Sequence, residues 1–347
     1  CRFKTLVLSI LSLLGGTASV VLFPAVLCGE VRPRTEAKPN ILFIFADDWG
    51  WGDLGCHGHP WLKTPNIDRL ASEGTEFYQF TVASGVCSPS RTAVMTGHFP
   101  ARYGIHGHFA TVESHMKREM PDWLDPKAVL LPRLFQESGY ATAHFGKWHL
   151  TNIMVPDAPL PIRYGYDTYG AFNCSGPQMP VHDDARLAID FIRRSHTAGK
   201  PFFITLWIHE PHTPHYPLAE YLKEFAHLGD EAKEIYAAVL AHADARIGEV
   251  LIELERLGLT DNTLVIFSSD NGPVWYEEDV ERFDHDSSGG LRGMKADAWE
   301  AGHRMPFIVR WPGKVRPGST TAQMVCFTDL LRTFAEILDV QVSPNAG

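Results

Sequence analysis

The segment Ser84-Gly-Val-Cys-Ser-Pro-Ser-Arg-Thr-Ala-Val-Met-Thr-Gly97 predicts a helix over residues 88–96. Pro89 fits the first turn of a helix, because its φ is fixed and the N–H that it lacks has no partner there. Gly97 follows as a C-terminal stop. Cys87 would then lie at the amino end of the helix, where free N–H groups favour negative charge. Arg91 comes four residues later, on the same helical face, so the segment suits the binding of a tetrahedral oxyanion.

Length and charge restrict the classes of protein to consider. A chain of 347 residues can bury a sizeable core, as one large α/β domain or two smaller ones. The net charge of −10 argues against nucleic acid as the main partner. An anionic substrate still fits if its site is locally basic or holds a metal ion. The six cysteines include no Cys-x-x-Cys pair, which disfavours a metal–thiolate site. A disulfide between Cys56 and Cys174 remains open.

The N-terminal region predicts export of the folded part. An almost uncharged segment over 6–27 follows Arg2 and Lys4, as in a secretory signal. The same segment is long enough for an uncleaved membrane anchor, so both interpretations stay open for residues 1–30. Residues 31–39 are polar and contain proline, and we interpret them as a linker to a catalytic domain over 40–347. We therefore expect a secreted, periplasmic or membrane-anchored protein whose folded part lies outside the cytoplasm.

Two apolar runs of strand length end in oxygen-bearing side chains. Residues 40–46 precede Asp47 and Asp48, and residues 264–267 lead to Asp270 and Asn271. Ligand crevices of open α/β sheets lie at the carboxyl ends of their strands. Three carboxylates and an amide oxygen there select a hard divalent cation, Ca²⁺ or Mg²⁺, over zinc. The alternative is an ordinary loop in which one Asp is a cap and the other is solvated.

Two further segments carry candidate catalytic side chains. If residues 140–149 form a strand, Lys147 and His149 point to the same side, where they would neutralise an oxyanion and transfer a proton. Another strand, 201–208, leads into three histidines separated by prolines. Their place in the family pattern named below favours His212 as the site residue and ranks His209 and His215 second. Zinc is disfavoured, because no Cys or further His-rich tract accompanies the three histidines.

The segment around Cys87 and the segment 139–149 resemble the two sequence motifs of the sulfatase family, and the similarity extends from about Pro39 to the end of the chain. The resemblance implies that a maturation enzyme oxidises Cys87 to formylglycine. It also implies that Ca²⁺ is bound by the side chains named above together with the oxygen of formylglycine 87. Lys295 lies five residues before Glu-Ala-Gly, where the family has Glu-Gly-Gly, and takes the role of a second sulfate-binding cation.

The resemblance also implies the fold, an α/β domain like that of alkaline phosphatase with a mixed, mostly parallel sheet between helices. We expect the smaller C-terminal sheet domain of the family to be missing, so that the chain is truncated. The remaining patterns predict helices over 64–71, 130–138, 182–196, 231–257 and 327–340, a strand over 306–311, and a polar Gly-rich loop over 284–293.

The resulting hypothesis is the hydrolysis of an aryl or carbohydrate sulfate ester. One hydroxyl of hydrated formylglycine 87 would attack sulfur, while Arg91, Lys147 and Lys295 stabilise the transition state. His149, or less favourably His212, would protonate the leaving alcohol, and the second hydroxyl would then expel sulfate. One alternative is a phosphodiesterase or phosphonate monoester hydrolase of the same superfamily. Another is a non-catalytic surface binding protein with a relic site.

Overall fold

The computed structural model describes residues 37–274 and 285–342. The predicted signal or anchor, most of the linker and the first residue of the Gly-rich loop lie outside these described residues. Residues 38–347 form one compact unit. None of the helices within the described ranges combines the length and the apolar character that a membrane span needs.

The described part is built on an eight-stranded sheet with the order β5-β4-β6-β1-β7-β8-β2-β9. Neighbouring strands are parallel except at β8, which is antiparallel to both β7 and β2. This confirms the expected α/β fold with a mixed, mostly parallel sheet. The strands are β1 (Asn40–Asp47), β2 (Thr75–Phe77), β4 (Ala141–Lys147), β5 (Thr168–Phe172), β6 (Phe202–Pro211), β7 (Thr263–Ser269), β8 (Phe307–Arg310) and β9 (Ser319–Thr321). A separate pair joins β3 (Phe80–Thr81) and β10 (Val325–Cys326).

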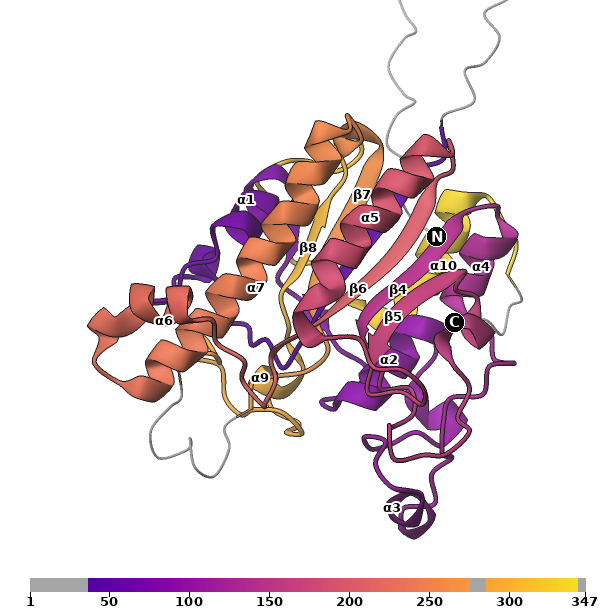
Figure 1. Cartoon of the computed structure of the whole chain (residues 1–347), viewed down its shortest axis with the longest axis horizontal. Coiled ribbons are helices and arrows are strands. Elements are labelled where there is room, and N and C mark those ends of the chain that lie inside the picture. The colour runs from indigo at the N-terminus through magenta and orange to yellow at the C-terminus, as the bar shows by residue number, and fades with distance from the viewer. Residues whose placement is uncertain (1–36, 275–284, 343–347) are drawn as a thin grey trace, which may run out of the picture. The chain divides into compact units, whose positions relative to one another are not determined.

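Helices cover both faces of the sheet (Figure 1). On one face lie α1 (Pro65–Glu73), α5 (Asp184–Thr197) and α7 (Glu231–Arg256). On the other lie α2 (Cys87–Thr96), α4 (Leu131–Glu137) and α10 (Leu330–Leu338). Every residue of β1 is buried, which explains why its sequence is a continuous apolar run rather than an alternating one. Shorter helices are α3 (Val112–Lys117), α6 (Ala219–Phe225) and α9 (Glu300–His303).

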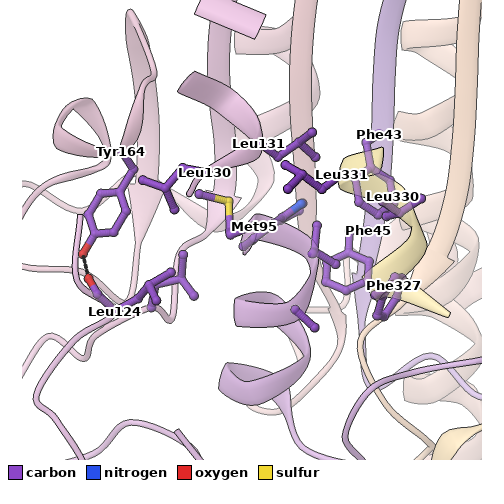
Figure 2. Packing of buried hydrophobic residues seen from close by; sticks show 14 of the residues in the cluster. Phe43, Phe45, Met95, Leu124, Leu130, Leu131, Tyr164, Phe327, Leu330 and Leu331 are labelled. Atoms are coloured by element: carbon purple, nitrogen blue, oxygen red, sulfur yellow. Dashed lines mark hydrogen bonds between the residues drawn. The ribbon is translucent and has the colours of Figure 1, made fainter. Parts of the chain in front are cut away.

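Apolar contacts fix α2 against the sheet and its neighbouring helices. Met95 of α2 lies in one buried cluster with Leu130, Leu331 and Phe45, which come from the start of α4, from α10 and from β1 (Figure 2). All ten residues of α2 are buried. Burial of about 25 cal/mol per Å² of apolar surface makes such a contact set the main force that holds the helix in place.

Several predicted element ends differ from the observed ones, and three of these differences bear on the candidate sites. The strand predicted over 140–149 ends at Lys147, and His149 adopts a left-handed conformation with φ of 50°. The argument that Lys147 and His149 share one side of a strand is therefore wrong. By contrast, β6 continues to Pro211 and includes His209. The predicted helix over 182–196 begins only at Asp184, after a 3-10 turn, η4 (Val181–Asp183).

The disulfide between Cys56 and Cys174 does not form, since both residues are free thiols. Cys174 packs in the apolar cluster on the α2 side of the sheet. Cys56 is exposed, and its backbone N–H donates to Asp68 of α1, on the opposite side. The sheet therefore separates the two sulfur atoms.

Candidate active site

The carboxyl ends of β1 and β7 bring four oxygen-bearing side chains together. β1 ends at Asp47, and Asp48 follows with φ of 67°. The backbone N–H of Asp48 donates to Asp270 Oδ1 at 3.0 Å, which ties the two strand ends to each other. Carboxylate oxygens of Asp47, Asp48 and Asp270 lie within 4.8 Å of one another. Asn271 donates from Nδ2 to Asp48 Oδ1 at 2.6 Å, so its amide is oriented by the same group.

Three oxygens of this group fit a hard cation. Asp47 Oδ1, Asp48 Oδ2 and Asn271 Oδ1 are buried, and none has a hydrogen-bond partner among the described residues. Buried polar atoms normally have hydrogen-bond partners. A set of unpartnered oxygens in one place therefore indicates a site for a cation. Carboxylate and amide oxygens suit Ca²⁺ or Mg²⁺. The predicted metal ligands are thus brought together in a form that fits a hard divalent ion.

Cys87 faces these ligands from the first residue of α2. Val86, the residue before it, is extended with φ of −137°, so the helix begins at the position that carries the sulfur. The thiol lies within 4.8 Å of ligand atoms of Asp47 and His212. Burial raises the pKa of the Cys87 thiol to about 11, although Lys295 and Lys147 oppose this shift. A neutral buried thiol is a poor nucleophile, which agrees with a precursor that needs chemical modification.

Three cations balance the three carboxylates. Arg91 donates to Asp270 Oδ2 at 2.7 Å and lies 3.3 Å from Asp47 Oδ1, with its guanidinium over the rings of Phe45 and Trp207. The other two are lysines: Lys147 Nζ contacts Asp47 Oδ2, and Lys295 Nζ contacts Asp48 Oδ1 at 2.5 Å. A bound divalent ion would therefore give the site a net positive charge, which favours an anionic ester.

The neighbouring charges move the pKa values of two carboxyls in opposite directions. Burial alone would raise the pKa of Asp47, but Lys147, His212 and Arg91 hold it well below its usual value. Burial and the charge of Asp47 raise the pKa of Asp270 to about 7, despite Arg91. Asp47 is consequently the permanent anion of the pair.

Both candidate histidines offer a nitrogen without a proton. His149 Nε2 donates to the Phe109 carbonyl at 3.0 Å, and its buried Nδ1 has no hydrogen-bond partner among the described residues. His212 Nδ1 donates to the Thr213 carbonyl at 2.5 Å, and its Nε2 lies 3.8 Å from Asp48 Oδ2. Burial and Lys147 lower the pKa values of both imidazoles, that of His212 to about 4. Both rings are therefore neutral proton acceptors.

The second-choice histidines belong to the supporting loop. His209 Nε2 contacts the Pro214 carbonyl at 3.1 Å, and His215 Nε2 contacts the Pro211 carbonyl at 2.9 Å. Sequence reasoning missed Phe109, whose carbonyl oxygen orients His149. A backbone carbonyl leaves no signal in the residue type, so no motif indicates this role.

Known proteins are similar to this chain in sequence and in fold. The Sulfatase family model matches residues 39–340. N-acetylgalactosamine-6-sulfatase of Rattus norvegicus is 32% identical over 372 residues, covering 96% of this chain and 65% of the relative. Arylsulfatase A of Bos taurus is 31% identical, covering 89% of this chain and 66% of the relative. The solved structure of Ps i-CgsB in complex with k-i-k-neocarrahexaose has a TM-score of 0.77 at 27% identity, and covers 89% of this chain and 74% of that one.

The chain belongs to the sulfatase family. This confirms the resemblance that the two motifs indicated. The chain spans less than two thirds of the length of the N-acetylgalactosamine-6-sulfatases that it matches, which are covered to between 61% and 65%.

Proposed function

We propose that this protein hydrolyses sulfate esters, with formylglycine formed from Cys87 as the source of the nucleophile and a bound Ca²⁺ beside it. The observation that supports the proposal is the convergence of Cys87, the unpartnered metal-ligand oxygens and three cations at one sheet edge. Membership of the sulfatase family supports the same reaction. When bound, the cation supplies charge that lowers the pKa of the attacking hydroxyl and polarises a sulfate oxygen.

Position 87 would supply the nucleophile, and three cationic side chains would stabilise the transition state. The hydrated aldehyde at position 87 carries two hydroxyls, and the oxygen of one forms a bond to sulfur while the bond from sulfur to the alcohol oxygen breaks. Arg91, Lys147 and Lys295 would hold the sulfate oxygens and stabilise their charge in the transition state. The second hydroxyl then passes its proton to the departing sulfate, the carbon–oxygen bond to sulfate breaks, and the aldehyde forms again. Addition of water to the aldehyde restores the two hydroxyls.

Proton transfer falls to the two histidines. Because His149 and His212 each present an unprotonated nitrogen, one of them can accept the proton of the attacking hydroxyl. The protonated ring is then the acid for the leaving alcohol. The imidazole accepts one proton from the hydroxyl and donates one proton to the alcohol. A single imidazole is therefore neutral again after each ester bond is cleaved.

Mass spectrometry of the peptide that contains residue 87 tests the proposal. Protein from a host with the maturation enzyme should carry formylglycine there and should cleave an aryl sulfate faster than the matching aryl phosphate esters. Cys87→Ser should be sulfated without release or should lose turnover, because a single hydroxyl lacks the second step. Cys56→Ser, which changes an exposed thiol, should keep full activity.

Three results would contradict this assignment. Preference for the phosphate esters would favour the phosphodiesterase or phosphonate monoester hydrolase alternative. An unmodified Cys87 in protein from the native host would favour a relic site in a binding protein. Full steady-state activity of Cys87→Ser would contradict the two-hydroxyl scheme.

The class of substrate is a second part of the proposal. The rat relative is named for the 6-sulfate of N-acetylgalactosamine. A sulfated carbohydrate is therefore the substrate class that we propose first, with aryl sulfates as assay substrates. The apolar N-terminal segment supports export, where such carbohydrates are reached, and modification of Cys87 requires a maturation enzyme as a partner.

A further inference from the structure

A second cluster of ligand-type side chains lies where η4, β6 and α7 meet. It consists of His182 on the 3-10 turn, Glu210 near the end of β6 and His242 on α7. One ligand atom of each residue lies within 4.8 Å of those of the other two. None of the three belongs to the candidate active site.

The ligand atoms of this cluster lack partners. His182 Nε2, Glu210 Oε1 and His242 Nδ1 are buried without a hydrogen bond to any described residue. Glu210 is 2% exposed and His242 is 9% exposed. His182 Nε2 and Glu210 Oε1 lie 3.1 Å apart, the distance of an ion pair when the imidazole is protonated. Two ligands of a tetrahedral zinc ion, with bonds of about 2.0–2.1 Å, lie at about this separation.

The surroundings hold two of the three side chains, Glu210 and His242, in their metal-binding forms. Burial would raise the pKa of Glu210, but Arg246, which contacts Glu210 Oε2, lowers it to about 2, so the carboxylate is ionised. Arg246 is fixed in turn by Asp184 Oδ1 at 2.9 Å. Burial and Arg246 lower the pKa of His242 to about 4, so its ring is neutral. The ring of His242 packs edge-on against His182 at 4.5 Å. Neutral imidazoles and an ionised carboxylate are the forms that bind metals.

We propose that His182, Glu210 and His242 form a structural site for Zn²⁺, with water as the fourth ligand. Two nitrogens and one oxygen select zinc over Ca²⁺ or Mg²⁺, which prefer oxygen ligands alone. The ion would join three elements that are distant in sequence. Because Glu210 lies two residues before His212, it would also fix the strand end that carries this candidate catalytic histidine.

A competing group provides the matched control. Cys56, His57 and Glu76 also place ligand atoms within 4.8 Å of one another. Both nitrogens of His57 are already engaged, Nδ1 with the Trp51 carbonyl at 2.6 Å and Nε2 with Glu76 at 2.9 Å. This group therefore lacks the free ligand atoms that distinguish the first one.

Calorimetric titration of the full chain with Zn²⁺, in saturating Ca²⁺, tests the proposal. We expect one high-affinity zinc ion per chain and a higher thermal midpoint when it is bound. His182→Gln should weaken the zinc affinity by more than about tenfold. This histidine is a quarter exposed, so the variant should still fold. Cys56→Ser should bind zinc as the unaltered chain does, and His212→Ala should too, which separates the site from the active site.

Three results would overturn the proposal. They are the absence of a zinc-binding step, an unchanged affinity in a folded His182→Gln variant, and the loss of binding in Cys56→Ser or His212→Ala. Anomalous diffraction at the zinc edge then locates the ion, and a peak away from Glu210 and His242 would contradict the assignment.

Discussion

Cys87 is 2% exposed in the folded chain and its thiol is neutral. The proposed oxidation of Cys87 needs direct access of a maturation enzyme to this sulfur, so we expect it to precede the docking of α2 against the sheet. The burial of all ten residues of α2 supports this order of events.

Asp53 gives the chain a pH-dependent stability that is separate from the metal ligands. Its buried carboxyl accepts hydrogen bonds from the Gly50 N–H at 2.8 Å and the Tyr236 hydroxyl at 2.9 Å. Burial nevertheless raises its pKa from 3.8 to about 7. The folded state therefore binds the proton more tightly than the unfolded state. The stability contributed by this proton is complete below pH 3.8 and is lost as the pH rises through about 7.

We therefore predict that Asp53→Asn flattens the pH profile of stability. Asn keeps the shape of Asp without its charge. The free energy of unfolding of the variant, relative to that of the unaltered chain, should therefore rise by roughly 1–3 kcal/mol between pH 5 and pH 7. Urea unfolding at both pH values measures the free energy of each protein. A difference between variant and unaltered chain that stays constant with pH would show that Asp53 does not titrate in this window.

At the scale of elements, the end of α2 depends on Gly97. This residue has φ of 67°, and a Cβ placed there would lie 2.5 Å from the Cβ of Leu331 on α10. Gly229 has the same φ of 67° with no heavy atom within 4 Å of such a Cβ. The two glycines thus separate backbone strain from a steric clash.

We predict that Gly97→Ala destabilises the protein more than Gly229→Ala does. The backbone cost is about 1–2 kcal/mol in both variants, and overpacking against α10 adds about 1–3 kcal/mol at Gly97 alone. Thermal unfolding and urea unfolding provide the comparison. Gly97→Ala should also lower activity in protein that is still folded, because α2 carries Cys87 and Arg91. Equal losses of stability in the two variants would mean that α10 shifts and so avoids the clash with the new methyl group.

The N-terminus of α1 is capped by a side chain of another helix, α7. Thr64 precedes this helix and has the residue type of an N-terminal cap, but its hydroxyl donates to Asp68 instead of capping the helix. The free N–H groups of Asn66 and Ile67 donate to Asp244 of α7, at 3.1 Å and 2.9 Å. The predicted helix is confirmed, and the acceptor at its N-terminus is a residue of α7 that no local pattern indicates.

At the scale of the whole molecule, the proposed cation would couple β1 to β7 and stabilise the domain. Binding of Ca²⁺ to the folded state alone adds about 2.7 kcal/mol when the free ion is 100 times its Kd. We predict that Ca²⁺ raises the unfolding midpoint over protein in EGTA, and that Mg²⁺ does so less, because it dehydrates reluctantly. Asn271→Ala removes one ligand oxygen and should weaken the response.

Denaturation with each ion measures these effects, and Asn262→Ala, far from the ligands and exposed, is the control. Equal stabilisation by Mg²⁺ and Ca²⁺ would contradict the preference for Ca²⁺. An undiminished response of Asn271→Ala would remove this residue from the ligand set.

Sequence patterns alone predicted five of the eight sheet strands (β1, β4, β6, β7 and β8), the helix that carries Cys87 and the residue types of the candidate site. Local rules suffice for these features: buried strands are continuous apolar runs, and Pro89 and Gly97 mark the two ends of a helix. Strand ends also implied which acids would meet, since parallel strands end at one sheet edge.

Packing in three dimensions determines which polar atoms have hydrogen-bond partners and which have none, and the sequence does not show it. The unpartnered oxygens of Asp47 and Asn271, the carbonyl of Phe109 that orients His149, and the separation of Cys56 from Cys174 all depend on packing across the sheet. The physical reason is that hydrogen-bond satisfaction is set by neighbours in space, and most of these neighbours are far apart in the chain.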